Sequence, residues 1–237
     1  MEEDYIRVIN ITMFGVISWG LIFILLRRIF SNYSFDFSTR IVSALHATVA
    51  VILATLTIQD WSCPVCPTAS MSTIQQMETM AFSLSYMTYD LICSNFVQLL
   101  SIDNAVHHSI CILGFVAGLC SRECGSEIVA ALWIGEISTP FLNLRVILKE
   151  IGYRDTDLNL AADVISFSIC SLINKGLARM VGGPYLVYVT ISVDSPFLIK
   201  AMALGLQLVS AFWFYKILKM MRYKLIKKSI PTENLLG

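Results

Sequence analysis

Charged residues are scarce in this sequence: they make up 14% of its 237 residues, whereas hydrophobic residues make up 56%. A soluble domain carries roughly 25% charged residues, so this composition excludes an ordinary water-exposed surface. The mean hydropathy of +0.70 agrees with that conclusion. The sequence also lacks internal repeats, low-complexity segments and any linker long enough to join a second domain. We therefore expect one compact integral membrane protein.

Seven apolar runs account for most of the chain, and each is long enough, or nearly so, to cross a hydrocarbon layer of ~30 Å. They cover residues 8–26, 41–58, 78–100, 104–120, 128–148, 160–191 and 197–220. The sixth run is too long for one straight span, so we expect it to break or tilt at Gly182-Gly183-Pro184. The sequence predicts an all-α, polytopic membrane bundle of about seven transmembrane helices.

The ends of the runs predict the orientation. The first run follows Glu2, Glu3 and Asp4, without a basic segment before it or a small-residue cleavage site after it, so we expect a retained helix rather than a signal peptide. With seven spans, one side of the membrane receives only Arg7, Arg122 and Lys200. The other side receives Arg27, Arg28, Arg40, Arg145, Lys149, Arg154, Lys216, Lys219, Arg222, Lys224, Lys227 and Lys228. Because basic loops stay cytosolic, we expect a lumenal or exterior N-terminus and a cytosolic C-terminus.

Four of the seven cysteines fall in the two predicted lumenal loops, namely Cys63, Cys66, Cys120 and Cys124. Disulfides persist in such compartments. We expect a structural disulfide, either within one loop or between the two. A redox role stays open because Cys63 and Cys66 have the spacing of a redox motif, although no βαβ pattern surrounds them.

Polar residues inside the runs are the candidate functional groups, because ionisable groups are costly in the membrane. His46, Asp90, the pair His107-His108 and Asn143 lie at a similar predicted depth. Polar residues also recur at helical spacing in three runs, which places them on one face of each helix. These stripes are Glu136, Thr139 or Pro140, and Asn143; Ser83, Tyr86, Asp90 and Ser94; and Asp163, Ser166, Cys170 and Asn174. Together they predict a shared interior cavity.

Structural roles for these polar groups stay open. Many such groups only form interhelical hydrogen bonds of about 0.6 kcal/mol, and Asp90 or Glu136 can simply pair with Lys175 or Arg179. His46 alone is typical of a buried histidine with its own partners. Neighbouring residues on a helix differ by about 100°, so at most one histidine of the pair is expected to point squarely into the cavity, where it can act as a general base. Adjacent histidines are poorly spaced for a metal, so we expect none.

Five short segments carry the polar residues in a recognisable order. They are Arg40-Ile-Val-Ser-Ala-Leu-His46, Ser85-Tyr-Met-Thr-Tyr-Asp90, Val106-His-His108, Gly135-Glu-Ile-Ser-Thr-Pro-Phe-Leu-Asn-Leu-Arg145 and Arg179 with the following Gly-Gly-Pro-Tyr185. In these segments the sequence resembles the TLC domain, the module shared by ceramide synthases, the translocating-chain-associated membrane protein and a lipofuscinosis protein of the endoplasmic reticulum. The resemblance spans residues 36–222, leaving 1–35 as a first transmembrane helix with a cytosolic loop and 223–237 as a cytosolic tail. Within the family, the sequence is most similar to the small branch that includes transmembrane protein 136.

The resemblance implies a six-helix barrel with a lipid-accessible cavity. In ceramide synthases, a histidine pair at the position of His107 and His108 supports acyl transfer from acyl-CoA to a sphingoid base. Here these two residues are the candidate base, with Asp90 and Glu136 as orienting acids. The candidate ligand-binding residues are His46, Tyr86, Ser138, Thr139, Asn143 and Arg179. The sequence departs from the synthases because one carboxylate, Glu136, stands where they carry further acids.

Two functions therefore stay open, and the sequence does not decide whether the protein is an enzyme. One is lipid homeostasis through binding or regulating a sphingolipid or phospholipid. The other is a lipid acyltransferase of ceramide-synthase type with acyl-CoA as co-substrate. A receptor or transporter is disfavoured because receptor-like triplets and inverted repeats are absent. We expect membrane lipids and no nucleic acid as partners, and the endoplasmic reticulum, with the plasma membrane or Golgi as alternatives.

Overall fold

Eight helices are seen in the computed structural model of the protein, which describes residues 2–96, 101–153, 156 and 182–229. They are α1 (Glu2–Ile29), α2 (Phe35–Thr57), α3 (Ile74–Phe96), α4 (Ile102–Ser121), α5 (Gly125–Glu136), α6 (Thr139–Glu150), α8 (Gly183–Ser192) and α9 (Phe197–Ser229). Within these residues, β-structure is limited to one isolated bridge between Met71 and Glu123. The predicted all-α class is confirmed.

Five helical segments within the described residues have the length and apolar character of a membrane span. They are α1, α2, α4, the consecutive pair α5–α6 (Gly125–Glu150) and the Phe197–Lys216 part of α9. The helix α3 is long as well, but its polar stripe lowers its hydropathy. Most of the predicted sixth run lies outside the described residues; α8 begins directly after Gly182, with Pro184 in its first turn, where a proline is well tolerated.

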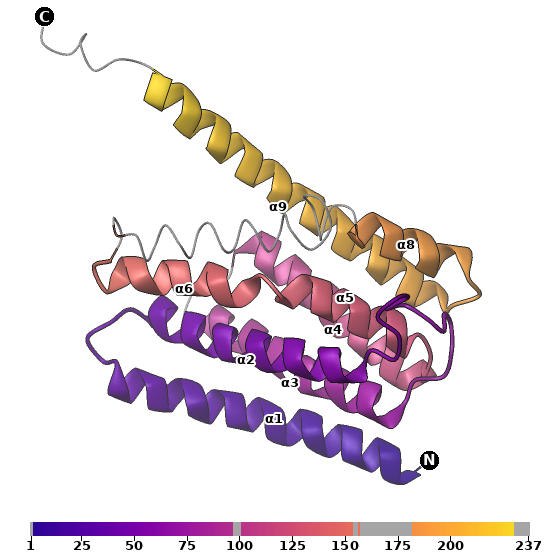
Figure 1. The fold of residues 1–237 in the computed structure, drawn as a ribbon. Coiled ribbons are helices and arrows are strands. Elements are labelled where there is room, and N and C mark those ends of the chain that lie inside the picture. The colour runs from indigo at the N-terminus through magenta and orange to yellow at the C-terminus, as the bar shows by residue number, and fades with distance from the viewer. Residues whose placement is uncertain (1, 97–100, 154–155, 157–181, 230–237) are drawn as a thin grey trace, which may run out of the picture.

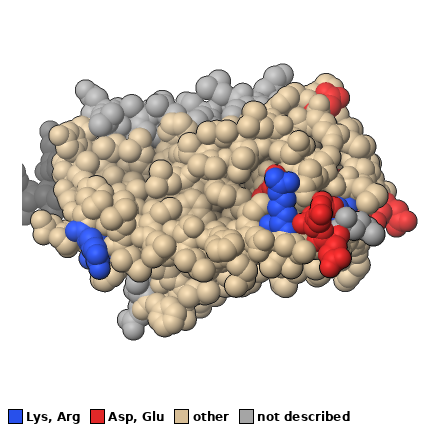
Figure 2. Space-filling view, turned by 90° about the horizontal axis from the view of Figure 1, so that it is seen from below, with Lys and Arg blue, Asp and Glu red and all other residues tan. Residues whose placement is uncertain are grey.

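The surface of α1 fits a lipid environment. Glu2, Glu3 and Asp4 occupy its first turn, and Arg27 and Arg28 occupy its last turn. Seen from the side of α1, charged residues gather toward the two ends and the surface between them is uncharged (Figure 2). An uncharged surface of this length is poorly solvated by water and suits the hydrocarbon layer of a membrane. Together with the other apolar helices, it identifies a multi-pass membrane protein.

The helices are arranged in successive layers, with α1 on one outer side and α8 and α9 on the opposite side (Figure 1). The helix α1 packs on α2 and α3, α2 packs on α5 and α6, and α3 packs on α4. The helix α9 packs on α4 and α8. Toward its C-terminus, α9 extends beyond the other labelled helices (Figure 1).

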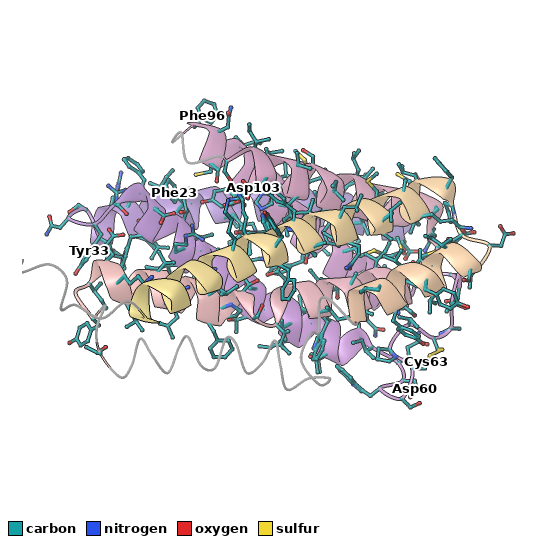
Figure 3. All side chains as sticks on the ribbon, turned by 90° about the horizontal axis from the view of Figure 1, so that it is seen from above. Phe23, Tyr33, Asp60, Cys63, Phe96 and Asp103 are labelled. Atoms are coloured by element: carbon teal, nitrogen blue, oxygen red, sulfur yellow. A yellow bond between two sulfur atoms is a disulfide. The ribbon has the colours of Figure 1, made fainter. Side chains whose placement is uncertain are left out.

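Loops from distant parts of the chain meet at the two ends of the bundle. Asp60 and Cys63 mark one end, here called the Cys63 end, and Tyr33 marks the other, the Tyr33 end (Figure 3). At the Tyr33 end, the backbone N and Oγ of Ser34 donate to the carboxylate of Glu150 over 2.6 and 2.8 Å. Ser34 also caps α2 by accepting from the N–H of Phe37.

At the Cys63 end, three chain segments are joined. Arg122 binds Asp4 of α1 over 2.7 Å, and its carbonyl accepts from the N–H of Ser72. The N–H of Cys124 donates to the carbonyl of Ser70. Cys63 and Cys66 form a disulfide within one loop, so the local one of the two predicted structural pairings is the one observed.

The predicted fifth span is divided by a break between α5 and α6, and residues of its polar stripe lie on both sides of the break. The helix α5 ends at Glu136, and α6 begins at Thr139 with Pro140 in its first turn. Proline has no N–H to donate to the carbonyl of Glu136, four residues earlier, so the regular helix is interrupted there. The interruption lies beside the interior of the bundle, where both Glu136 and Thr139 line a cavity.

Candidate functional site

A cavity of about 570 Å³ lies inside the bundle, lined by α2–α6, α8 and α9. Its lining includes Ile199 near the start of α9 and Lys216 further along that helix. Seventeen residues separate these two positions, which corresponds to ~25 Å along an α-helix. The cavity is therefore elongated, and its volume is within the usual range for small-molecule sites of roughly 300–1,000 Å³.

Polar side chains concentrate at the part of the cavity nearest the Tyr33 end, here called its polar end. They come from six helices: Asp36, Arg40 and Ser43 of α2; Tyr86, Asp90 and Ser94 of α3; Asn104, His107 and His108 of α4; Glu136 of α5; Thr139 and Asn143 of α6; and Trp213 and Lys216 of α9. Polar groups held by separate helices around one space form a site that can bind the polar part of a ligand.

The pair formed by Asp90 and His108 joins α3 to α4. The Nδ1 atom of His108 lies 3.3 Å from Oδ2 of Asp90, and both side chains are mostly buried. The pairing partner of Asp90 is thus a histidine, whereas the proposed alternatives Lys175 and Arg179 lie outside the described residues. The contact is electrostatic, because Nδ1 of His108 is buried without a hydrogen bond that meets geometric criteria. An imidazole held in this way can bind a polar head group or accept a proton from one.

The neighbouring His107 turns toward α9. Its ring centroid lies 4.9 Å from that of Trp213, and the indole N–H of Trp213 donates to Asp103 over 2.9 Å. Lys216 donates to the same carboxylate over 3.1 Å. Both histidines line the cavity, but they contact different helices: His108 lies beside Asp90 of α3, and His107 lies beside Trp213 of α9. Which of the two points squarely into the cavity stays a prediction.

The α2 wall of the polar end is connected to α6. The Nε atom of Arg40 lies 3.1 Å from Asp36, one helical turn earlier, and its Nη1 donates to Asn143 over 3.4 Å. The side-chain amide of Asn143 donates to the hydroxyl of Ser43 over 2.9 Å. Arg40 remains 41% exposed. The guanidinium is therefore held in place and still has surface available for an anionic or hydroxyl group.

The rest of the cavity is mostly apolar and extends toward the Cys63 end; we call this part its apolar end. Its lining includes Phe115, Ile128, Ala131, Leu132, Leu186, Val187, Ile199, Met202, Ala203 and Leu206, with Glu127 and Thr190 toward the Cys63 end. A cavity with one polar and one apolar end matches the two parts of an amphiphilic molecule.

Two predicted ligand-binding residues, His46 and Ser138, do not line the cavity, and a third lies outside the described residues. His46 is completely buried, with its ring stacked on Tyr86 at a centroid distance of 3.8 Å and beside Trp19, so it supports the wall of the cavity rather than lining it. Ser138 is buried in the break between α5 and α6 and is not part of the lining. Arg179 lies outside the described residues. Tyr86, Thr139 and Asn143, in contrast, do line the cavity.

Several lining residues escaped the sequence analysis. Trp213 and Lys216 lie one turn apart on α9 and face the cavity, and Asp103 in the first turn of α4 connects them. Two features of the sequence could have identified them: a carboxylate, Asp103, at the start of the fourth apolar run, and an aromatic and a basic residue, Trp213 and Lys216, toward the end of the seventh. Within the described residues, no three His, Cys, Asp or Glu side chains are grouped to hold a metal ion.

The fold and the cavity define the class of protein: a multi-pass helical membrane protein with an interior site suited to lipid contact. A sequence profile of the TLC domain matches residues 36–219, which is more than half of the chain. The chain therefore belongs to the TLC-domain family, as predicted. No solved structure gives a significant match. The assignment to the small branch that includes transmembrane protein 136 stays a prediction.

Proposed function

We propose that the protein binds one amphiphilic membrane lipid, a sphingolipid or a phospholipid, and acts in lipid homeostasis by binding or regulating such lipids. The head group occupies the polar end of the cavity and the chain extends toward the apolar end. The observation that carries this proposal is the division of one elongated cavity into a polar and an apolar end. A ligand with only one kind of surface leaves the other end of the cavity unmatched.

The contacts at the polar end support a head group with both donors and acceptors. Arg40 and Lys216 each have a carboxylate partner in Asp36 and Asp103. Neither cation therefore needs an anionic ligand to balance it. Asp90 of α3 and Glu136 of α5 supply acceptors in the cavity lining. We expect hydroxyl, amide or amine groups of a lipid to be bound in preference to a bare multiply charged anion.

The binding test uses a matched pair of substitutions on α9. Leu206 lines the cavity, whereas Leu208 is 62% exposed on the outside of the same helix. We expect Leu206→Trp to fill the cavity and remove most co-purifying lipid, measured by mass spectrometry after extraction from protein purified in mild detergent. Leu208→Trp is the control and retains the lipid. Equal lipid in both variants and in the wild type contradicts binding in this cavity.

Catalysis is the second candidate, favoured by the contact between His108 and Asp90 at the cavity wall. In this alternative a histidine takes the proton from the amine of a lipid while the amine nitrogen forms an amide bond with the acyl carbon of acyl-CoA. The C–S bond breaks, and CoA leaves as a thiolate that receives the proton from the histidine. The test compares lipid profiles of cells that lack the protein after restoration with wild type or with His107→Ala/His108→Ala at matched expression. Restoration by wild type alone favours the enzyme, provided that the variant still binds lipid. Equal restoration excludes catalysis by this pair.

The proposed orientation places the Cys63 end in the lumen or outside and the Tyr33 end in the cytosol. Cys120 is exposed near the Cys63 end, whereas Cys124 is completely buried, and burial raises the pKa of its thiol to about 12. A membrane-impermeant maleimide should therefore label Cys120 from the lumenal side and leave Cys124 unlabelled, because the thiolate is the reactive form. A Cys120→Ser variant is the control. Labelling of Cys120 from the cytosolic side inverts the orientation.

A further inference from the structure

Some residues at the apolar end of the cavity pack against a disulfide-containing loop. This loop, residues 58–73, connects α2 to α3 at the Cys63 end and contains the disulfide between Cys63 and Cys66. None of its residues lines the cavity. The loop instead lies behind α5 and α8, whose side chains do line it. We call residues 58–73 the disulfide loop.

Two contacts attach the disulfide loop to the cavity wall. Val65 is buried in one cluster with Ala130 of α5 and Leu186 of α8, and Cys63 and Ala131 pack against this cluster. Leu186 and Ala131 also line the cavity. One face of the wall therefore contacts the loop while the other faces the ligand space, so displacement of the loop removes support from the apolar end.

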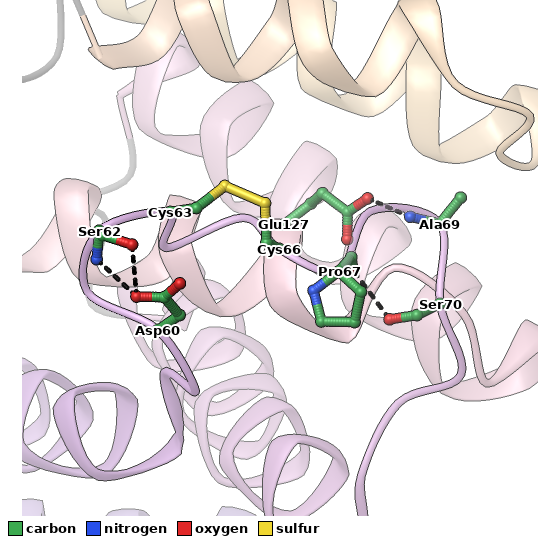
Figure 4. Close-up of a disulfide and its surroundings, with 8 residues drawn as sticks. All are labelled: Asp60, Ser62, Cys63, Cys66, Pro67, Ala69, Ser70 and Glu127. Atoms are coloured by element: carbon green, nitrogen blue, oxygen red, sulfur yellow. Dashed lines mark hydrogen bonds between the residues drawn. A yellow bond between two sulfur atoms is a disulfide. The ribbon is translucent and has the colours of Figure 1, made fainter.

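Glu127 forms the second contact and also marks the limit of the cavity. Its Oε1 accepts from the N–H of Ala69 over 2.6 Å, beside the disulfide (Figure 4). Its Oε2 is buried without a hydrogen-bond partner, although Glu127 is part of the cavity lining. Glu127 is only 2% exposed, and the hydrogen bond to Ala69 fixes its position. Its side chain therefore forms a held part of the wall that an apolar chain meets at this end of the cavity.

We infer that Glu127 and the disulfide loop determine the maximum length of the lipid chain that the cavity accepts. The inference rests on the proposed lipid binding. Glu136 at the polar end and Glu127 at the apolar end are nine residues apart, which corresponds to ~13 Å along α5. In this interval, Ile128, Ala131 and Leu132 of α5 line the space that the lipid chain would occupy. In a closed hydrophobic pocket, one methylene more or less changes binding by about 10–200-fold.

The test measures the chain-length distribution of lipid that co-purifies with the full-length protein. Glu127→Ala removes both the acceptor for Ala69 and the side chain that ends the cavity, and it should shift the bound chains toward longer species. Glu127→Gln is the matched control, because its amide oxygen still accepts from Ala69 and its volume is similar. We expect the ratio of longer to shorter chains to rise about tenfold in the alanine variant, as one methylene is worth at least that much, and to stay unchanged in the glutamine variant.

Two further variants keep the test decisive if Glu127→Ala folds poorly. Cys63→Ser/Cys66→Ser releases the loop and should also favour longer chains, whereas Cys120→Ser, at an exposed free cysteine, should not. Ala131→Phe fills the cavity from α5 and should shift the chains in the opposite direction, toward shorter species. Lipid with the same chain lengths in all variants overturns this inference alone. Absence of lipid from the wild type overturns the proposed function and the inference together.

Discussion

Where α1 packs against α2 and α3, aromatic rings fill the interior, whereas the opposite sides of α2 and α3 line a cavity of about 570 Å³ together with α4, α5, α6, α8 and α9. Trp19 of α1 lies edge-on to His46 and Tyr86, with ring centroids 6.0 and 5.6 Å away. A Cβ atom added to Gly15 would collide with the side chain of Ser85, so α1 and α3 touch there. The filled side can support one wall of the site, and the hollow side can accept a ligand.

This difference assigns separate roles to polar residues that look alike in the sequence. On the filled side, the indole N–H of Trp19 donates to Ser85 over 3.2 Å, and Ser85 donates to the carbonyl of Phe82 over 2.6 Å. Such bonds connect the helices and leave no group for a ligand. Beside the cavity, Asp90 and His108 are paired with each other and also line the open space. Substitutions on the filled side should therefore lower the free energy of unfolding, whereas substitutions beside the cavity should mainly lower lipid binding.

The largest effect is expected for Trp19→Ala on the filled side. Trp19 is 6% exposed, and removal of a buried tryptophan side chain costs about 3–5 kcal/mol in cores that cannot collapse. We expect that loss in the free energy of unfolding, measured by denaturant titration in mixed micelles. Phe14→Ala on the same helix is the control, because Phe14 is 67% exposed to the lipid side. If Trp19→Ala lost lipid binding but kept its stability, the filled side would not have the structural role assigned to it here.

A smaller effect on stability, with a direct effect on the ligand, is expected at the cavity. Lipid at a hundred times its dissociation constant stabilises a binding protein by about 2.7 kcal/mol. We expect Asp90→Asn and His108→Ala each to remove much of this lipid-dependent stabilisation, measured as the shift in unfolding midpoint on lipid addition. Because the two side chains contact each other, the double variant should lose less than the sum of the single losses. Leu45→Ala, on the exposed face of α2, should leave the shift unchanged.

The sequence was sufficient to predict that Asp90, His107, His108 and Asn143 share one region, because hydropathy fixes the depth of each residue in the membrane. Helical spacing also predicted that Glu136, Thr139 and Asn143 share one face, and all three line the cavity. In the stripe on α3, Tyr86, Asp90 and Ser94 line it as well, whereas Ser83 is buried away from it. Periodicity and depth therefore account for most of the polar end.

The pairings between helices could not be predicted in the same way. His46 lies at the same depth as the other polar groups, yet its ring is stacked on Tyr86, because rotation of α2 turns it toward α1. The pairing of Asp90 with His108 and that of Asp103 with Lys216 also depend on the rotation and register of neighbouring helices. A single sequence determines neither the rotation nor the register of a helix. It therefore predicts which residues are near the site but not which of them are in contact.

The smallest effect on stability is expected where α9 is joined to α4 at the polar end. The carboxylate of Asp103 accepts from Trp213 and Lys216, and Lys216 is 53% exposed. An exposed ion pair contributes about 1 kcal/mol or less. Asp103→Asn keeps an acceptor for the indole but loses the charge pair, whereas Asp103→Ala loses both. We expect the alanine variant to be the less stable of the two, with both losses at about this level.

Salt separates the two contributions, because ions screen an exposed charge pair but not a hydrogen bond to the indole. The difference in unfolding midpoint between wild type and Asp103→Asn should shrink at high salt, whereas the difference between Asp103→Asn and Asp103→Ala should persist. Among the described helices, α9 contacts only α4 and α8, so weakening this connection should also speed exchange of bound lipid, measured with a labelled lipid added in excess. An unchanged exchange rate in Asp103→Ala would indicate that lipid enters the cavity elsewhere than between α4 and α9.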